Sequence, residues 1–249
     1  MAVDSSTVVD SDFNFRRAIT VFKTNRLWPL FMASAFGLMV PQISVSVFLP
    51  QIVARLGFST IKTNLYTVAP NCVGALFTVA VAMSSDRTGD RTLHLAACLI
   101  ITCVGFIVLA VIDTAKHIAV GYFCCFLLTC GAYITSPLLT TWYNNNTPDE
   151  NQRAILTPVL VAAGNSMGLV GTNIFLPSTA PNYILASIIS AAFGGAAVVF
   201  VLGIGFYMKW DNERRNKEQG ITLKAKDLST FELKDGPLDP RWRWMGGIA

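Results

Sequence analysis

The chain has 249 residues, of which 53% are hydrophobic and 14% are charged, with a formal net charge of +4. An ordinary soluble domain carries about a quarter charged residues, so water is not the main solvent of this chain. We expect neither an enzyme nor a nucleic-acid partner, because the basic residues flank long uncharged stretches and form no basic patch of their own.

The uncharged stretches predict six transmembrane helices, since about 20 apolar residues in a helix cross the hydrocarbon core of a bilayer. The expected spans are residues 28–53, 62–83, 93–112, 118–142, 154–176 and 184–208. The last two come from one uncharged run, which a Pro/Ser/Asn cluster at 176–183 divides. The sequence therefore predicts an all-α membrane protein, a single six-helix bundle in the lipid bilayer.

Three regions follow one another along the chain: a polar N-terminal segment at 1–26, the transmembrane bundle at 27–208 and a tail at 209–249. An even number of spans places both termini on one side, and 16 of the 19 basic residues lie on that side. Because basic loops stay in the cytosol, both termini are expected to be cytosolic. Trp142 and Trp210 fall at cytosolic span ends, where aromatic side chains anchor helices at the membrane surface.

The stretch FNFRRAITVFKTNR at 13–26 interleaves aromatic and aliphatic residues with basic ones. This pattern is typical of an amphipathic helix that lies on the membrane surface. The alternative is a solvated linker whose charges only fix the topology.

Polar side chains inside the spans are the candidates for a solute path, because polar groups are costly in lipid and mark functional positions there. Five are taken as candidate solute-binding residues: Gln42, Asn71, Tyr133, Ser136 and Asn165. Gln42 and Ser136 rank first, since each lies beside a proline and a broken helix exposes backbone groups to a ligand. Hydrogen bonding between helices is the alternative role for each. None is charged, so a proton relay would have to lie on another segment.

In the fifth span Gly164, Gly168 and Gly171 recur at helical spacing, which clears one face for the close approach of another helix. Six cysteines lie within the spans, at spacings that suit neither a disulfide framework nor a metal site. We therefore assign the glycines to packing and expect no metal and no cofactor.

The tail begins with KWDNERRNKEQG, which is expected to continue the last helix to Gly220. Beyond that glycine we expect loose order. The end, DPRWRWMGGIA, carries Trp and Arg side chains suited to rest at the lipid headgroups.

Two short loops at the cytosolic end carry charges of both signs, DRTGDR at 86–91 and TPDENQR at 147–153. Opposite charges on neighbouring loops attract one another over short distances. We hypothesise that the loops pair through their charged side chains: Asp149, Glu150 and Arg153 with Arg87 and Arg91.

DRTGDR resembles the Asp-Arg-x-Gly-basic-basic loop that major facilitator superfamily transporters carry between spans two and three and, in a weaker copy, between spans eight and nine. The resemblance implies a cytosolic gate held by the matching residues and the loop opposite: Asp86, Arg87, Gly89 and Arg91, with Glu150 and Arg153. Departures from the pattern are typical of a degenerate second copy: Ala82, Ser84 and Asp90.

WYNNNTPDENQRA, GNSMGLVGTNIF and PSTAPNY, between residues 142 and 183, are similar to the region from span ten to span twelve in the fungal allantoate permease, or anion:cation symporter, branch of that superfamily. The resemblance implies a carboxyl-terminal six-span half of a twelve-span symporter in the plasma membrane. Solutes of this branch are small organic molecules, often anions, and the resemblance allows a coupled proton.

Two functions remain open on this reading. The first is secondary transport by alternating access, in which solute binds at the midplane between two six-span bundles and a second half or a second copy completes the site. The alternative is a truncated, non-transporting membrane fragment that packs against another carrier half or is inert.

Overall fold

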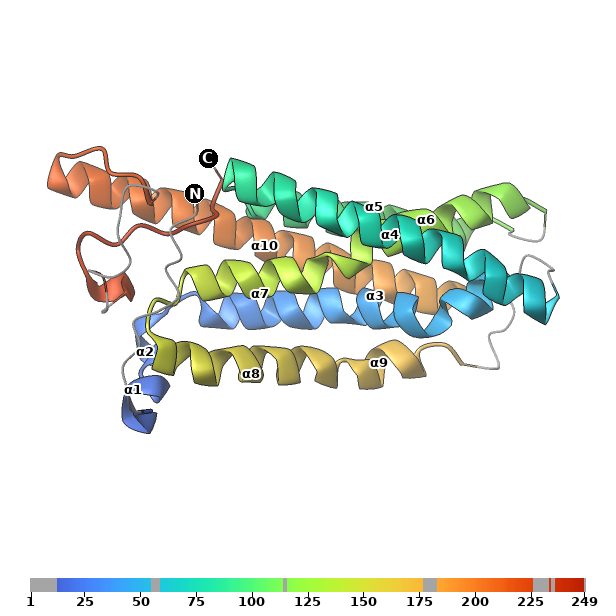
Figure 1. Ribbon diagram of the computed structural model, residues 1–249, viewed down its shortest axis with the longest axis horizontal. Helices are drawn as coiled ribbons and strands as arrows, with labels where there is room; N and C mark the ends of the chain where they lie inside the picture. The colour runs from blue at the N-terminus through green and yellow to red at the C-terminus, as the bar shows by residue number, and fades with distance from the viewer. Residues whose placement is uncertain are drawn as a thin grey trace.

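The computed structural model describes residues 13–54, 59–113, 116–176, 183–225, 233 and 236–248. Most of these residues are helical, and among them six helical stretches are long and apolar enough to cross a membrane. They run along one common direction and form a single bundle (Figure 1). The described part of the chain thus confirms an all-α fold with six spans.

The first three spans are single helices: α3 (Trp28–Ala54), α4 (Thr60–Thr88) and α5 (Thr92–Val111). The fourth span consists of α6 (Ile118–Tyr133) and α7 (Thr135–Asn145), and the fifth of α8 (Glu150–Ser166) and α9 (Gly168–Asn173). The sixth is α10 (Ile184–Gln219). Two short helices, α1 (Phe15–Ile19) and α2 (Val21–Thr24), precede the bundle, and a single 3₁₀ turn, η4 (Gly236–Leu238), lies in the tail.

The continuation of α10 past residue 208 and its end at Gly220 were both predicted correctly. Gly220 has a φ of 65°, the left-handed conformation that ends a helix and that glycine adopts without strain. Its N–H bonds back to the carbonyls of the last turn, so the polar stretch after residue 208 remains helical up to Gln219.

The interruption of the fourth span at Ile134 follows from Pro137. Proline has no N–H, so Pro137 cannot donate to the carbonyl of Tyr133, four residues earlier. α6 therefore ends at Tyr133 and α7 begins at Thr135. This break places Tyr133 and Ser136 at the junction of two helices in the middle of a span.

The first span, α3, is the centre of the bundle. It packs against α4, α6, α8 and α10, while α5 and α10 make the largest contact with each other. In Figure 1, α4 lies along the upper edge and α8 along the lower edge, with α3 and α7 between them, and α10 passes behind α7 and α3.

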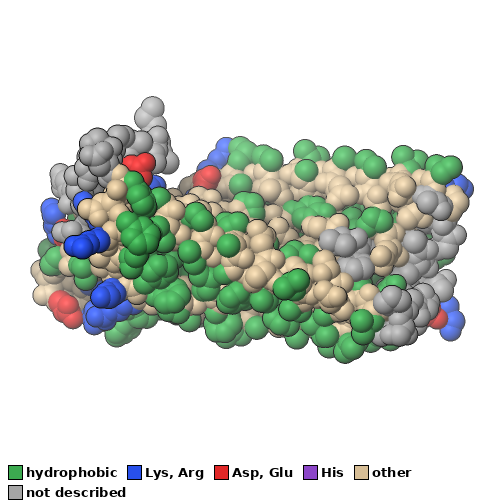
Figure 2. Space-filling view, turned by 90° about the horizontal axis from the view of Figure 1, so that it is seen from below, with side chains coloured by type: hydrophobic (Ala, Val, Ile, Leu, Met, Phe, Trp, Pro, Cys, Tyr) green, Lys and Arg blue, Asp and Glu red, His purple; other side chains and the backbone are tan. Residues whose placement is uncertain are grey.

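The two edge helices are the least buried of the six spans, and α10 is next at 33%. Of the spanning windows, 11% is buried in α4 and 22% in the fifth span, against 50% in α3, in α5 and in the fourth span. Large apolar side chains are exposed on these edges, among them Leu65, Leu76 and Leu169. Figure 2 shows hydrophobic side chains over the length of one face, with charged side chains gathered at its ends. This is the surface expected of a bundle that contacts lipid or another apolar bundle.

One end of the bundle carries α1, α2, the 86–91 loop, the start of α8 and the tail (Figure 1); we call it the basic end. An aromatic cluster forms its core, where the Phe31 ring meets Trp142 at 5.2 Å and Tyr143 at 5.7 Å between centroids, both edge-on. Trp142 is fully buried, so the prediction that it anchors at the membrane surface was wrong. Trp210 has the exposure that such a role requires.

Candidate functional site

Two of the candidate solute-binding residues meet across helices. The Tyr133 hydroxyl, at the end of α6, donates to Asn71 Oδ1 of α4 at 2.8 Å. The Asn71 amide in turn donates to the Thr67 carbonyl of its own helix at 2.9 Å. The contact ties the exposed edge helix to the middle of the bundle.

Ser136 and Asn165 line a shared pocket between α3, α7 and α8. Its volume is about 30 Å³, and Ala35, Met39 and Gly164 complete much of its wall. A water molecule in the liquid occupies about the same volume, whereas pockets for organic ligands usually exceed about 300 Å³. This pocket is therefore too small to enclose an organic solute.

Gln42 lies on α3, one helical turn beyond the pocket residues Leu38 and Met39. Its Oε1 is buried and has no hydrogen-bond partner among the described residues. Its backbone carbonyl accepts from the Ser46 hydroxyl at 3.0 Å. An unpaired buried acceptor costs about 1 to 3 kcal/mol, so Gln42 Oε1 is available to accept a hydrogen bond from a group outside the described residues.

We call the five candidate residues Gln42, Asn71, Tyr133, Ser136 and Asn165 together the polar face; they lie on α3, α4, α6, α7 and α8 respectively. The helices α5 and α10, which make the largest contact with each other, carry none of the five. The glycine stripe supports the geometry of the face, because a Cβ at Gly164 would lie 3.0 Å from Met39 Cγ and one at Gly171 would lie 3.2 Å from Ile43 Cβ. The fifth span can thus approach α3 closely enough to share the pocket.

At the basic end, the 86–91 loop is closed by an internal ion pair. The Arg91 guanidinium donates to Asp86 Oδ1 at 2.7 Å, across the turn that Gly89 makes at a φ of 72°. The Ser85 hydroxyl donates to the Asp90 carbonyl at 3.0 Å. The loop residues singled out in the sequence are therefore held together as one compact turn.

The hypothesised pairing between the two loops is not formed in the described part of the chain. Arg91 pairs with Asp86, and Asp149 pairs with Arg17 of α1. Asp149 also caps α8, where its side chain accepts from the Gln152 N–H at 3.2 Å, so both its oxygens are engaged locally. Glu150 and Arg87 are exposed and make no ion pair with each other.

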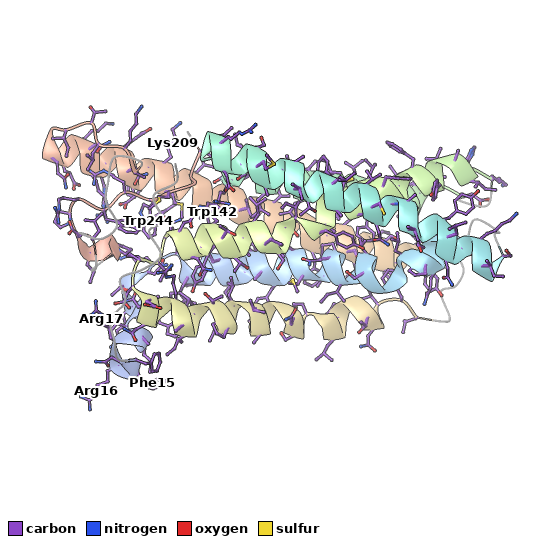
Figure 3. The ribbon with its side chains drawn as sticks, in the orientation of Figure 1. Phe15, Arg16, Arg17, Trp142, Lys209 and Trp244 are labelled. Carbon is purple, nitrogen blue, oxygen red and sulfur yellow. The ribbon has the colours of Figure 1, made fainter. Side chains whose placement is uncertain are left out.

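The N-terminal helices are docked on α8. Besides the ion pair of Arg17 with Asp149, the Asn14 N–H donates to Asn151 Oδ1 at 2.9 Å and the Gln152 amide donates to the Thr20 hydroxyl at 3.0 Å. Phe15 and Arg16 point away from the bundle (Figure 3). A free linker is excluded for this segment, and its exposed aromatic and basic side chains fit a membrane surface.

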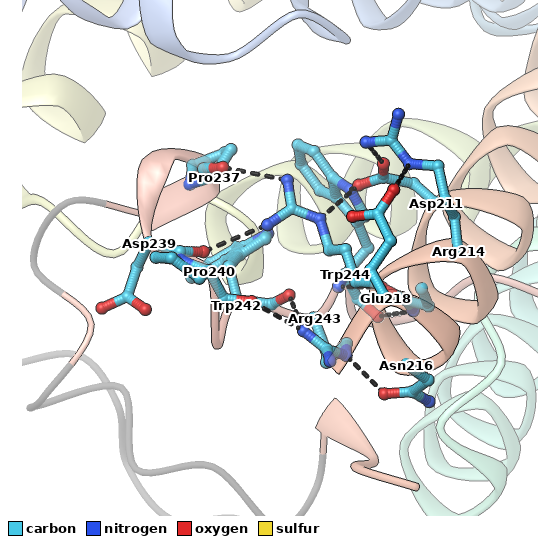
Figure 4. A network of polar contacts seen from close by, with 12 residues as sticks. Asp211, Arg214, Asn216, Glu218, Pro237, Asp239, Pro240, Trp242, Arg243 and Trp244 are labelled. Carbon is cyan, nitrogen blue, oxygen red and sulfur yellow. Dashed lines mark hydrogen bonds and ion pairs between the residues drawn. The ribbon is translucent and has the colours of Figure 1, made fainter. Parts of the chain in front are cut away.

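Residues 236–248 of the tail are ordered where loose order was expected, while residues 226–232 and 234–235 lie outside the described part of the chain. Trp242, Arg243 and Trp244 are 0%, 1% and 4% exposed, so the prediction that Trp and Arg of the tail end rest at lipid headgroups was wrong for these residues. They fold back onto α10, as Figure 4 shows. The sequence analysis missed the packing of residues 242–244 on α10 and the contact of Asn146 with Met245. The two tryptophans near the charged end of α10 were a signal that the tail packs on this helix.

This packing shifts the pKa values of two charged side chains in the tail, Asp239 and Arg243. Burial opposes ionisation of Asp239, but hydrogen bonds from Arg241 and the charges of Arg241 and Arg215 outweigh it and hold the pKa of Asp239 below its usual value. Burial lowers the pKa of Arg243, and Arg215 acts in the same direction while Asp211 opposes it. Guanidinium groups stay protonated in proteins, so Arg243 is a buried cation.

The family model described as Major Facilitator Superfamily matches residues 5–172. The chain belongs to the major facilitator superfamily. The matched range contains the 86–91 loop and the polar face, whereas α10 and the tail lie outside it. The fold and the loop resemblance thus agree on a major facilitator bundle.

Relatives in the major facilitator superfamily are named as transporters and are longer than this chain. An uncharacterized transporter, C1039.04, of Schizosaccharomyces pombe is 45% identical over 97% of this chain and 48% of its own length. The MFS-type transporter efuF of Hormonema carpetanum is 42% identical over 98% of the chain and 48% of its own length. The high-affinity nicotinic acid transporter of Saccharomyces cerevisiae is 26% identical over 95% of the chain and 43% of its own length.

The chain spans about half the length of the curated relatives it matches. No solved structure matches it at a significant level. A six-helix bundle of the major facilitator superfamily is therefore what the fold and the comparisons jointly establish.

Proposed function

We propose that the chain is the carboxyl-terminal half of a secondary transporter that moves a small organic solute, including organic anions, by alternating access. It belongs on this proposal to the allantoate permease, or anion:cation symporter, branch and spans the plasma membrane with its basic end in the cytosol. The observation that carries the proposal is the polar face, where Gln42 Oε1 lacks a partner in the described chain.

The polar side chains of the face favour contact with a second helix bundle. A polar group within a bilayer needs a hydrogen-bond partner, and lipid offers none. The pocket beside Ser136 and Asn165 holds about 30 Å³, so solute has to bind between this face and another bundle. The half-length match to named transporters supports the same arrangement.

The chemistry of the face suits a small carboxylate. The amide N–H groups of Gln42 and Asn165 and the second N–H of Asn71 are neutral donors for a carboxylate, and the Tyr133 hydroxyl joins them when solute replaces its bond to Asn71. The printed name of one relative, the high-affinity nicotinic acid transporter, makes nicotinate the first solute to test. No Asp, Glu, Lys or Arg occurs between residues 118 and 148 or 154 and 208, so a coupled proton is carried by the other half.

The Asp86–Arg91 turn is the proposed gate element at the cytosolic surface. Its ion pair of 2.7 Å keeps the loop compact, and exposed Arg87 and Glu150 remain available to a facing bundle. Arg153 belongs to the same surface at the start of α8. In this role the loop makes contacts with the other half when the cytosolic side is closed, and these contacts break when the halves rock apart.

The test is uptake of radiolabelled nicotinate by proteoliposomes that contain this chain alone or together with the amino-terminal six-span half of the S. pombe relative. We expect uptake only when both halves are present. In that pair, Gln42→Ala and Asn71→Ala should each lower uptake about tenfold, which corresponds to about 1.4 kcal/mol. Ile100→Ala, on the exposed surface of α5, is the control and should leave uptake unchanged.

Two other results of the uptake experiment would each indicate a different function. Uptake by the chain alone would mean that two copies complete the site. Formation of the two-half complex without uptake of nicotinate or of a panel of ureides and carboxylates would support the non-transporting fragment and contradict the proposal.

A further inference from the structure

The last described residues of the tail join three spans at the basic end. Residues 242–246, which we call the C-terminal strap, run from the end of α10 to α7 and on to the start of α5. Every residue from 242 to 244 is buried. This segment lies outside the range that the superfamily model matches.

The strap is anchored on α10 by Arg243 and Trp244. The Arg243 guanidinium donates to Asn216 Oδ1 at 2.9 Å, to Gln219 Oε1 at 2.9 Å and to two carbonyls of the tail. The Trp244 indole donates to Asp211 Oδ2 at 2.9 Å, and its backbone exchanges two hydrogen bonds with the Asn212 side chain. Figure 4 shows these contacts on the polar extension of α10. A buried cation with four oxygen partners fixes the strap in one position.

The strap then crosses to α7. Asn146, just past the end of α7, accepts from the Met245 N–H at 2.8 Å and donates to the Met245 carbonyl at 2.9 Å. The Trp142 indole donates to the same carbonyl at 2.9 Å. Figure 3 places Trp142 and Trp244 close to one another at this end of the bundle. The backbone of Met245 is therefore satisfied by side chains of the fourth span.

The strap ends on the 86–91 loop. The Gly246 carbonyl accepts from the Arg91 N–H and the Thr92 N–H, each at 3.2 Å, and from the Thr92 hydroxyl at 2.9 Å. Gly246 has a φ of 79°, and a Cβ there would lie 2.8 Å from the Trp142 ring. Only glycine fits this position, because any side chain meets both a strained backbone and the indole.

We propose that the C-terminal strap is a positioning segment for the 86–91 loop, so that the Asp86–Arg91 pair depends on residues 242–246. The inference rests on the proposed function for its consequence in transport. Its structural basis is that α4 packs mainly on α6 and α3, and the loop joins it to α5. The strap fixes Arg91 and Thr92 at the start of α5, and thereby the guanidinium that reaches Asp86.

The first measurement follows amide hydrogen exchange of the full chain in nanodiscs. Gly246→Ala and Arg243→Ala should each raise the exchange rate of loop amides 90–92 at least tenfold, while peptides from α3 and α6 exchange as in the unchanged chain. Arg241→Ala is the matched control: the Arg241 side chain is 55% exposed and pairs with Asp239, and loop exchange should not change. Unchanged loop exchange in both test variants, with the strap itself exchanging freely, would overturn the proposal.

The second measurement asks whether the strap acts through the Asp86–Arg91 pair. In the two-half uptake assay, Gly246→Ala should reduce uptake in the unchanged background and cause no further reduction when Asp86→Asn is already present. A strap that only adds stability would lower uptake by the same factor in both backgrounds, which would contradict a positioning role. Absence of uptake by the unchanged halves would refute the transport proposal, and the exchange experiment would still decide whether the strap positions the loop.

Discussion

The polar face in the middle of the bundle and the basic end differ in how many hydrogen bonds their side chains make within the described chain. On the face, Gln42 Oε1 has no partner among the described residues, and the pocket beside Ser136 is about the size of one water molecule. At the basic end, Arg243 alone makes four hydrogen bonds and Asn146 holds both backbone groups of Met245. The basic end thus has the denser hydrogen-bond network, although Trp242 Nε1, Asn25 Nδ2 and Thr24 Oγ1 there are, like Gln42 Oε1, buried without a partner among the described residues.

This difference means that the same helices carry some side chains that mainly stabilise the fold and others that mainly serve function. Side chains that bond within the chain stabilise the bundle, and their loss costs folding free energy. Side chains with unused hydrogen-bonding capacity cost stability and are retained where a ligand or partner uses them. Substitutions at the basic end should therefore affect unfolding most, and substitutions on the polar face should affect uptake most.

The largest expected effect is that of Trp142→Ala. Its ring is fully buried against Phe31 and its indole N–H bonds to Met245, so we expect a loss of about 3 to 5 kcal/mol in the free energy of unfolding. Reversible unfolding in mixed detergent micelles measures it. Trp210→Ala, at a half-exposed position on α10, should cost less than about 1 kcal/mol, and equal losses at the two positions would break the comparison.

A pair of amides compares the two regions directly. Asn146→Leu leaves the Met245 N–H and carbonyl without their amide partner and should cost about 2 to 3 kcal/mol. Gln42→Leu removes an unpaired oxygen and should leave stability unchanged within about 0.5 kcal/mol, or raise it. Unfolding and uptake are measured on both variants, and Gln42→Leu should lose uptake. A marked loss of stability in Gln42→Leu would show that the polar face is part of the folded core.

Substitutions at two glycines of α10 test how closely α10 packs against α5. A Cβ at Gly205 would lie 2.3 Å from Thr92 Cγ2, so Gly205→Ala should cost about 1 to 3 kcal/mol. At Gly203 no atom lies within 4 Å, and Gly203→Ala should stabilise the helix by about 0.5 to 1 kcal/mol. The same unfolding assay compares them, and a stabilising Gly205→Ala would contradict the close approach of α10 to α5.

The smallest expected effect is that of Tyr133→Phe. The single hydrogen bond to Asn71 joins α4 to α6, and such bonds between membrane helices are worth about 0.6 kcal/mol on average. Unfolding should change by no more than that, whereas uptake by the two halves should fall. If stability falls and uptake does not, the alternative role of helix-to-helix bonding is correct for this pair.

The sequence alone predicted the spans because lipid imposes one strong rule, that uncharged helical stretches of fixed length cross it. It predicted the end of α10 because glycine in the left-handed conformation is a local signal. It failed at the tail, where burial of Trp242 and Arg243 depends on contacts between segments distant along the chain. It also gave Arg91 the wrong partner, since Asp86 lies within the same turn and loses less entropy on pairing than a residue of another loop.

The central claim is that the polar face is completed by a second six-helix bundle, and native mass spectrometry of this chain co-expressed with the amino-terminal half of the S. pombe relative tests it most directly. We predict a one-to-one complex, with a symmetric dimer forming where that half is absent. A chain that stays monomeric in both conditions, with its bundle intact, would contradict the account.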